Sequence, residues 1–329
     1  MKFDANSLII KDIDEVSEGI QKFIKEQVFN NFKKNGAVIG ISGGIDSAVV
    51  SALCEKALGP NRVLGVLMPE KESDPNSRIY AEDLCKKIGI KTEIVDLTPI
   101  LESFHVYETR DQIIKRNFTE FDKSCRYRVV VVNDLMQKDG ISIPYLEVAD
   151  ADNFVHKIKL PYQDYLTLTA ATNIKHRVRM TILYYHGERN HFLVAGTTNK
   201  SEVVQGYFVK YGDGGVDIEP IANLFKTQIF QLARHLDIPE QIIQRKPSPD
   251  TWSFTVSDEE FFYGIPYNVI DLLWYAREQN IPKGDIQKVL GLSAEQVDRI
   301  FENQSRKWGA SKHLREMPPK WDGKIILNK

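Results

Sequence analysis

The segment from residue 37 to residue 58 constrains the fold of this chain most strongly. Its apolar run at 37–41 predicts a buried strand, and residues 47–58 have the pattern of a helix that ends at Gly59. The turn that joins them contains Gly40, Ile41, Ser42, Gly43, Gly44, Ile45, Asp46 and Ser47. A strand, a glycine-rich turn and a helix in this order bind phosphates. Backbone N–H groups can approach the oxygens there, and the helix N-terminus is partly positive.

Asp46 adds an acidic side chain to this turn. A carboxylate repels phosphate, so its presence in a phosphate-binding turn indicates a bridging Mg²⁺ ion. The turn lacks both the lysine of the Walker pattern and the GxGxxG dinucleotide pattern. A tight turn without a ligand is the alternative interpretation of its two adjacent glycines. The seven histidines of the chain form no metal-binding pattern.

Strand and helix patterns alternate along most of the chain. Further strands are predicted at 63–67, 94–97 and 192–195, and helices at 13–28, 75–88, 166–185, 226–236, 268–279 and 293–303. We therefore expect an α/β fold with a doubly wound, mostly parallel sheet and helices on both faces. The length of 329 residues is compatible with a single domain that spans residues 1–329.

Residues 104–163 depart from this alternation. Patterns typical of strands occupy 126–132, 143–150 and 156–162. No linker rich in glycine, serine or proline flanks the segment. We predict a β-rich insertion within the domain, near the substrate side, rather than a separate unit joined by linkers.

Composition limits the classes of partner. A net charge of −2 gives no strong field for nucleic acid or a membrane surface. The three cysteines are widely spaced and form no CxxC pair, so neither a zinc ribbon nor a disulfide framework is indicated. The acidic start does not resemble a signal peptide, and no apolar run reaches membrane-spanning length. We expect a cytoplasmic protein that acts on small molecules.

Three motifs resemble one enzyme family. The SGGxDS string at 42–47 is similar to the pyrophosphate loop of the ATP pyrophosphatases, which have the adenine nucleotide alpha hydrolase-like fold. Residues 195–236 contain GTxxxxE and KYGDGGxDxxP, and residues 173–180 contain NxxxRxRM. These resemble the ammonia-dependent NAD synthetase family. The resemblance covers about 20–100 and 166–319, without the insertion.

This resemblance implies roles for individual residues. It implies that ATP is bound by Gly40, Ile41, Ser42, Gly43, Gly44, Ile45, Asp46, Ser47, Thr197, Lys226 and Ser248. It implies Mg²⁺ ligation by Asp46 and Glu202, catalytic roles for Asp46 and Lys226, and substrate contacts from Arg177, Lys210, Asp217, His313 and Leu314. Lys226 begins a predicted helix, where a cation is unfavourable unless an anion such as phosphate binds beside it.

The implied reaction is the ATP-dependent amidation of a carboxylate through an acyl-adenylate. Nicotinic acid adenine dinucleotide, ammonia and ATP would give NAD, AMP and pyrophosphate. The family usually has lysine where this chain has Leu314, so a ligase for a different carboxylate, such as a sugar acid, remains open. A non-catalytic nucleotide-binding subunit is a third interpretation. The resemblance implies a homodimer, with ammonia taken up free or delivered by a separate glutaminase subunit.

Overall fold

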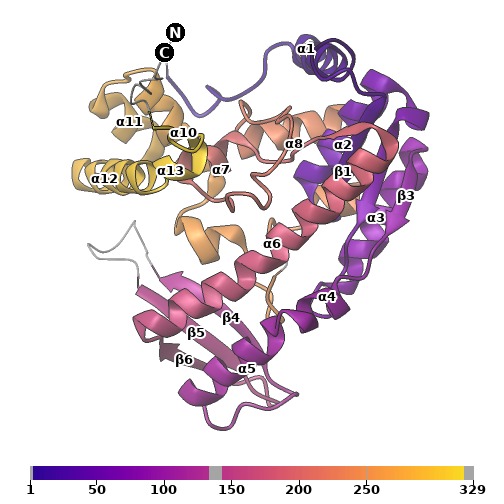
Figure 1. The fold of residues 1–329 in the computed structure, drawn as a ribbon. Helices are drawn as coiled ribbons and strands as arrows, with labels where there is room; N and C mark the ends of the chain where they lie inside the picture. The colour runs from indigo at the N-terminus through magenta and orange to yellow at the C-terminus, as the bar shows by residue number, and fades with distance from the viewer. Residues whose placement is uncertain (1–2, 133–142, 250, 322–329) are drawn as a thin grey trace, which may run out of the picture.

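The main sheet consists of four parallel strands in the order β3-β2-β1-β7, of which Figure 1 labels β1 and β3. Our computed structural model describes residues 3–132, 143–249 and 251–321. The four strands are β1 (Gly36–Gly40), β2 (Val63–Leu67), β3 (Lys91–Ile94) and β7 (Phe192–Val194). Each of the three neighbouring pairs is parallel, which confirms the prediction of a parallel sheet.

Helices cover both faces of this sheet. Side chains of β1 alternate between two cores, because Ala37 and Ile39 pack on one side and Val38 on the other. The helices on the first side are α1 (Ile13–Lys25), α2 (Ile45–Leu58), α3 (Pro75–Ile88) and α8 (Lys226–His235). Those on the second are α4 (Thr98–Ser103), α5 (Val106–Asn117) and α6 (Tyr162–Asn190). The predicted doubly wound α/β fold is therefore confirmed.

Local chemistry explains the ends of α3. The side chain of Asp74 accepts a hydrogen bond from the N–H of Asn76, and Pro75 occupies the first turn. Gly89 ends the helix in the left-handed conformation at φ 72°. These signals lie within a few residues of one another, which is why the sequence predicted this helix closely.

The third strand lies earlier than we predicted. The expected strand at 94–97 is wrong, because the residues that pair with β2 are Lys91–Ile94. All four β3 side chains are exposed, since the strand lies at the edge of the sheet. The apolar residues Val95 and Leu97 that prompted the prediction pack instead in the core on the α6 side.

The segment at 104–163 contains the helix α5 and a separate sheet. β4 (Arg126–Val132), β5 (Ile143–Ala149) and β6 (Val155–Lys159) form an antiparallel sheet beside α6 (Figure 1). The β-like interpretation of 104–163 is corrected at its start, because α5 is helical and buries residues at both of its ends, Val106 and Ile114 among them. The division into one domain with an insertion stays a prediction.

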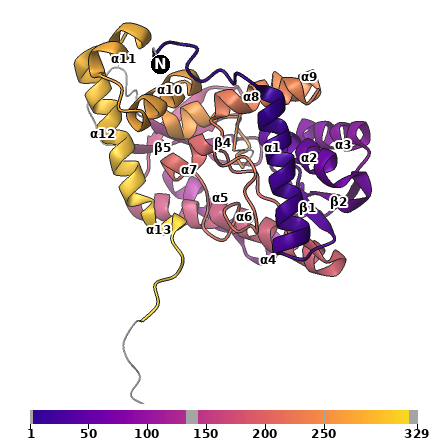
Figure 2. The same ribbon diagram turned by 90° about the horizontal axis from the view of Figure 1, so that it is seen from above.

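A group of C-terminal helices forms a second layer. Its members are α10 (Tyr267–Glu278), α11 (Lys283–Leu290), α12 (Ala294–Ala310) and α13 (Lys312–Arg315). Their core includes Leu273, Ile286 and Ile300, and it also takes in Val204 of α7 (Lys200–Gln205). Beyond α13 the described chain runs away from the body of the molecule (Figure 2).

Shorter elements complete the described chain. They are α9 (Glu240–Ile243), the 3₁₀ turn Pro60–Arg62 and the π-helical turns Glu26–Asn31 and Glu259–Tyr263. None of the helices in the described ranges, the 29-residue α6 included, combines the length and the apolar character that a membrane span requires.

Candidate active site

The glycine-rich turn lies between the end of β1 and the start of α2. Gly43 has φ 74°, and a Cβ atom there would lie 2.2 Å from the carbonyl oxygen of Ser77. A larger residue would therefore meet both a strained backbone and a collision with α3. The turn needs glycine at this position for a structural reason as well as for any approach to phosphate.

Two serine hydroxyls hold the turn in shape. Ser47 Oγ donates to the carbonyl of Gly44 at 3.0 Å and accepts from the N–H of Ser42 at 3.3 Å. The N–H of Gly44 donates to Ser42 Oγ at 3.2 Å. These bonds link the two ends of the turn, so the hydroxyls position the backbone as well as offering polar atoms.

Three charged side chains from distant parts of the chain meet beside this turn. Lys226 Nζ, at the start of α8, lies 2.5 Å from Asp46 Oδ2, at the start of α2. The same nitrogen is 3.9 Å from Glu202 Oε1 on α7. The Lys226 side chain is only 2% exposed. The structure therefore brings together the residues predicted to be catalytic and to bind metal.

Asn199 joins two members of this cluster and was missed by the sequence analysis. Its Nδ2 donates to Asp46 Oδ1 at 3.1 Å, and its Oδ1 accepts the N–H of Glu202 at 3.1 Å. Glu202 Oε2 in turn accepts the N–H of Asn199, which completes a capping box at the start of α7. The spacing Asn-x-x-Glu is a known signal for this cap and could have identified the residue.

Burial and like charge define the electrostatics of the cluster. Burial raises the pKa of Glu202 well above its ordinary value, and the charge of Asp46 raises it further, although Lys226 opposes the shift. Burial also raises the pKa of Asp258, which accepts from the hydroxyls of two tyrosines. Burial acts to lower the pKa of Lys226, but the surrounding carboxylates outweigh it and raise that pKa. In this cluster the carboxyl groups of Asp46, Glu202 and Asp258 outnumber the single ammonium of Lys226.

This donor set suits a magnesium ion bound together with phosphate. Asp46 Oδ2 and Glu202 Oε1 lie 2.5 Å and 3.9 Å from one cation, the Lys226 ammonium. Among the described residues no three acidic, histidine or cysteine side chains are arranged to hold a metal by themselves. Mg²⁺ commonly takes one or two carboxylates and completes its shell with water and substrate phosphate.

A cavity of about 300 Å³ opens beside the glycine-rich turn. Residues 40–42 at the end of β1 and 67–70 at the end of β2 line it, together with residues 73–75, 77 and 78 and Arg179 of α6. Ligands of open parallel sheets gather at these carboxyl ends of the strands. The cavity has the position expected of a nucleotide pocket.

The remaining predicted residues are less closely grouped. Arg177 is exposed on α6, and it is Arg179, on a different side of that helix, that lines the cavity. Thr197 is half-buried in the loop between β7 and α7. Ser248 is half-buried beside Pro247, whose carbonyl accepts the N–H of Asp258 at 3.0 Å.

Lys210 connects the KYGDGG loop to the C-terminal segment. Its Nζ donates to the carbonyls of His313 at 2.6 Å and Glu316 at 3.0 Å. His313 is exposed and Leu314 is half-buried in α13. The structure thus groups three of the five predicted substrate residues.

Asp217 belongs to the loop between α7 and α8, and it lies beside Val194, the last residue of β7. Its Oδ2 accepts the N–H of Val194 at 2.8 Å, and its Oδ1 accepts from the hydroxyl of Tyr184 at 3.0 Å. Both carboxylate oxygens therefore have partners within the protein, which join the loop to β7 and to α6.

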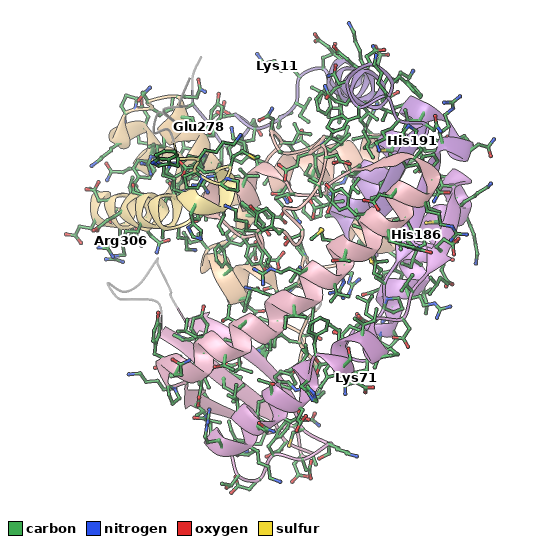
Figure 3. All side chains as sticks on the ribbon, in the orientation of Figure 1. Lys11, Lys71, His186, His191, Glu278 and Arg306 are labelled. Atoms are coloured by element: carbon green, nitrogen blue, oxygen red, sulfur yellow. The ribbon has the colours of Figure 1, made fainter. Side chains whose placement is uncertain are left out.

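Two of the histidines lie at the far end of α6. Figure 3 shows His186 and His191 near the C-terminal end of that helix, beside the main sheet. His186 is buried, and His191 Nε2 lies 2.9 Å from the carbonyl oxygen of Lys33. His186 is therefore part of the packed interior, and the exposed His191 contacts the chain before β1.

A parallel sheet covered on both faces, with a glycine-rich turn after an internal strand, defines an α/β protein of the nucleotide-binding class. The family model described as NAD synthase matches residues 16–141 and 130–318. The chain belongs to the NAD synthase family.

Individual relatives agree with this assignment. The NH(3)-dependent NAD(+) synthetase of Rhizobium meliloti (strain 1021) is 36% identical over 314 residues, which cover 95% of this chain and 92% of the relative. The NH3-dependent NAD synthetase structure from Campylobacter jejuni has a TM-score of 0.62 at 25% identity, with 94% of this chain and all of that chain covered.

The fold is shared more widely. An NMN synthetase structure from Francisella tularensis has a TM-score of 0.66 at 23% identity and covers 95% of this chain and 100% of that chain. The expected limit of the family resemblance is corrected, because the family model also matches residues of the 104–163 segment.

Proposed function

We propose that this chain catalyses the ATP-dependent amidation of nicotinic acid adenine dinucleotide with ammonia, forming NAD, AMP and pyrophosphate. The observation that carries the proposal is the meeting of Asp46, Glu202 and Lys226 at the glycine-rich turn of a NAD synthase family member. An ammonium and two carboxylates beside a phosphate turn suit a reaction that transfers charge onto pyrophosphate.

The first step forms an acyl-adenylate. A carboxylate oxygen of the dinucleotide attacks the α-phosphorus of ATP, and the bond from that phosphorus to the bridging oxygen breaks, so pyrophosphate leaves. Lys226 is the group that we expect to bind the leaving phosphates, since its ammonium is buried and already directed at the turn. The backbone of residues 40–47, Thr197 and Ser248 would hold the rest of ATP.

Magnesium would be held by Asp46 and Glu202 together with phosphate oxygens. When bound, it would neutralise charge on the phosphates. The role of Asn199 would be to orient Asp46, because its amide already donates to one carboxylate oxygen.

The second step forms the amide. The nitrogen of ammonia attacks the acyl carbon, the bond to the phosphate oxygen of AMP breaks, and one proton is released. We propose that Arg177, Lys210, Asp217, His313 and Leu314 lie along the dinucleotide. We further propose a homodimer that works in the cytoplasm, where ATP is available, with ammonia taken up free or from a separate glutaminase subunit.

Leu314 favours a second candidate, an amide ligase for a different carboxylate such as a sugar acid. A half-buried leucine cannot donate a hydrogen bond where a lysine is expected. The similarity to the Francisella tularensis structure concerns the fold and does not decide the substrate.

One assay separates the candidates. The purified chain is incubated with ATP, Mg²⁺, ammonia and nicotinic acid adenine dinucleotide, and AMP, pyrophosphate and NAD are measured. Stoichiometric AMP and NAD are expected. Turnover only with another acid would favour the second candidate, and ATP binding without pyrophosphate release would indicate a non-catalytic nucleotide-binding subunit.

A further inference from the structure

Asp271 is a buried carboxylate that the proposed chemistry does not use. It lies on α10, in the C-terminal helical layer, and is 1% exposed. Its Oδ1 accepts from Ser201 Oγ at 2.7 Å, and its Oδ2 accepts from the N–H of Thr227 at 3.1 Å. One side chain therefore binds two different helices, α7 and α8.

The same contacts reach the backbone of Lys226. Ser201 Oγ accepts the N–H of Lys226 at 2.9 Å, while it donates to Asp271. The first two N–H groups of α8 thus have partners supplied by α7 and α10. Free N–H groups at a helix start need such partners, and a carboxylate there also complements the helix dipole.

Ser201 and Thr227 are direct neighbours of the reacting cluster in the sequence. Ser201 precedes Glu202, and Thr227 follows Lys226. Asp271 consequently holds the backbone segments that carry the side chains of Glu202 and Lys226. Lys226 and Glu202 lie only 3.9 Å apart at their charged atoms, so small shifts of α7 against α8 change their geometry.

We propose that Asp271 is a positioning residue for the reaction: through Ser201 and Thr227 it holds the starts of α7 and α8 so that Lys226 and Glu202 face ATP together. This inference rests on the proposed function for its kinetic consequences. A misplacement of about 1 Å in a reacting group costs on the order of 100-fold in rate.

A second contact between the same two helices gives a matched control. Glu278, labelled in Figure 3, also lies on α10, and its Oε2 accepts from Lys200 Nζ of α7 at 2.6 Å. This pair docks α10 on α7 without any hydrogen bond to the start of α8. Removing the charge of Glu278 therefore weakens a more exposed contact of α10 with α7 and leaves the hydrogen bonds at the start of α8 in place.

The test compares Asp271→Asn, Ser201→Ala, the double variant and Glu278→Gln in pyrophosphate release with saturating ammonia and dinucleotide. We expect Asp271→Asn to lower kcat about 10- to 100-fold, with the KM for ATP within about threefold of the wild type. The double variant is expected to lose less than the product of the two single losses, because Ser201 mediates one of the two contacts of Asp271 with the start of α8. Glu278→Gln is expected to stay within about twofold of the wild type.

An Asp271→Asn kcat within twofold of the wild type, or an equal loss in Glu278→Gln, would overturn the inference. If Asp271→Asn does not fold, the kcat of Ser201→Ala tests the inference instead. A kcat about tenfold below that of the wild type supports the positioning role of Asp271, and an unchanged kcat contradicts it. If the wild type turns over no carboxylate, the proposed function fails. The inference is then decided by the Lys226 Nζ–Asp46 Oδ2 distance in a crystal structure of a folded variant, Asp271→Asn or otherwise Ser201→Ala. This distance is expected to lengthen, and an unchanged 2.5 Å would count against the inference.

Discussion

Lys226 Nζ lies 2.5 Å from Asp46 Oδ2, although 180 residues separate the two along the chain. Each residue lies in the first turn of a helix: Lys226 is the first residue of α8, and Asp46 is the second residue of α2. Two helix N-termini therefore converge on one point beside the glycine-rich turn. An anion bound there would meet two positive helix ends and an ammonium, and the Mg²⁺ ion that we propose would offset the carboxylates of Asp46 and Glu202.

Asp46→Asn is expected to abolish most pyrophosphate release without unfolding the protein. The change removes the negative charge that we propose to bind Mg²⁺ and leaves a side chain of the same size. Loss of such an electrostatic contact typically lowers the rate about 10²- to 10³-fold. Circular dichroism checks the fold, and near-normal turnover at saturating Mg²⁺ would remove Asp46 from the mechanism.

Asn199 has two separable roles, as a helix cap and as a donor to Asp46. Asn199→Ser keeps a capping oxygen but its short hydroxyl does not reach Asp46, so turnover is expected to fall about tenfold with little loss of stability. Asn199→Ala loses both roles and should cost about 1 kcal/mol more in unfolding free energy. Equal activity of Asn199→Ser and the wild type would show that Asp46 needs no such partner.

Two adjacent glycines of the turn should respond differently to alanine. Gly43 has φ 74°, and a Cβ atom on it would lie 2.2 Å from the Ser77 carbonyl oxygen. Gly43→Ala is therefore expected to lower the free energy of unfolding by more than about 2 kcal/mol and to weaken ATP binding. Gly44 has φ −91° and only Ser42 Oγ nearby, at 3.2 Å, so Gly44→Ala should cost about 0.5–1 kcal/mol. Urea unfolding and calorimetric titration with ATP measure both effects. Equal losses in the two variants would contradict this account.

Leu314→Lys tests whether the pocket has lost one substrate contact. A hydrogen bond to a charged group contributes about 1.5–3 kcal/mol, so kcat/KM for nicotinic acid adenine dinucleotide is expected to rise about tenfold or more. Lys312 is exposed, and its Nζ lies 3.3 Å from Glu316 Oε1, so we expect Lys312 to contribute little to binding of the dinucleotide. No effect of Leu314→Lys, together with loss of activity in Lys312→Ala, would assign the contact to Lys312 instead.

Asp271 should make the stability of the protein depend on pH. Burial raises its pKa from 3.8 to about 6, against hydrogen bonds from Ser201 and Thr227 that oppose the shift. The folded state thus binds this proton more tightly than the unfolded chain, so the associated stability is present at pH 4 and lost as the pH rises to 6. Relative to Asp271→Asn, the wild type should lose about 2 kcal/mol of unfolding free energy between pH 4 and pH 6. Urea unfolding at pH 4, 5, 6 and 7 measures it, and a constant difference would contradict the raised pKa.

Much of the fold could be predicted because its signals are local. Apolar runs, caps and turn glycines lie within a few residues of one another, so the strand and turn around Gly43 and the ends of α3 follow from the sequence. Asp46, Glu202 and Lys226 could also be named, since each lies in a short motif of a known family. α5 was missed because its buried side chains stand among charged ones and the neighbouring segments have strand patterns.

What the sequence by itself determined is the set of local elements and the chemical groups they carry: a parallel α/β sheet, a phosphate-binding turn, two carboxylates and a lysine. Only the tertiary structure decided which groups meet. It placed Arg179 rather than Arg177 at the cavity, and it joined Asn199 to Asp46 and Asp271 to the start of α8. The physical reason is that such contacts depend on how helices far apart in the chain pack against one sheet, and no pattern of neighbouring residues records that packing.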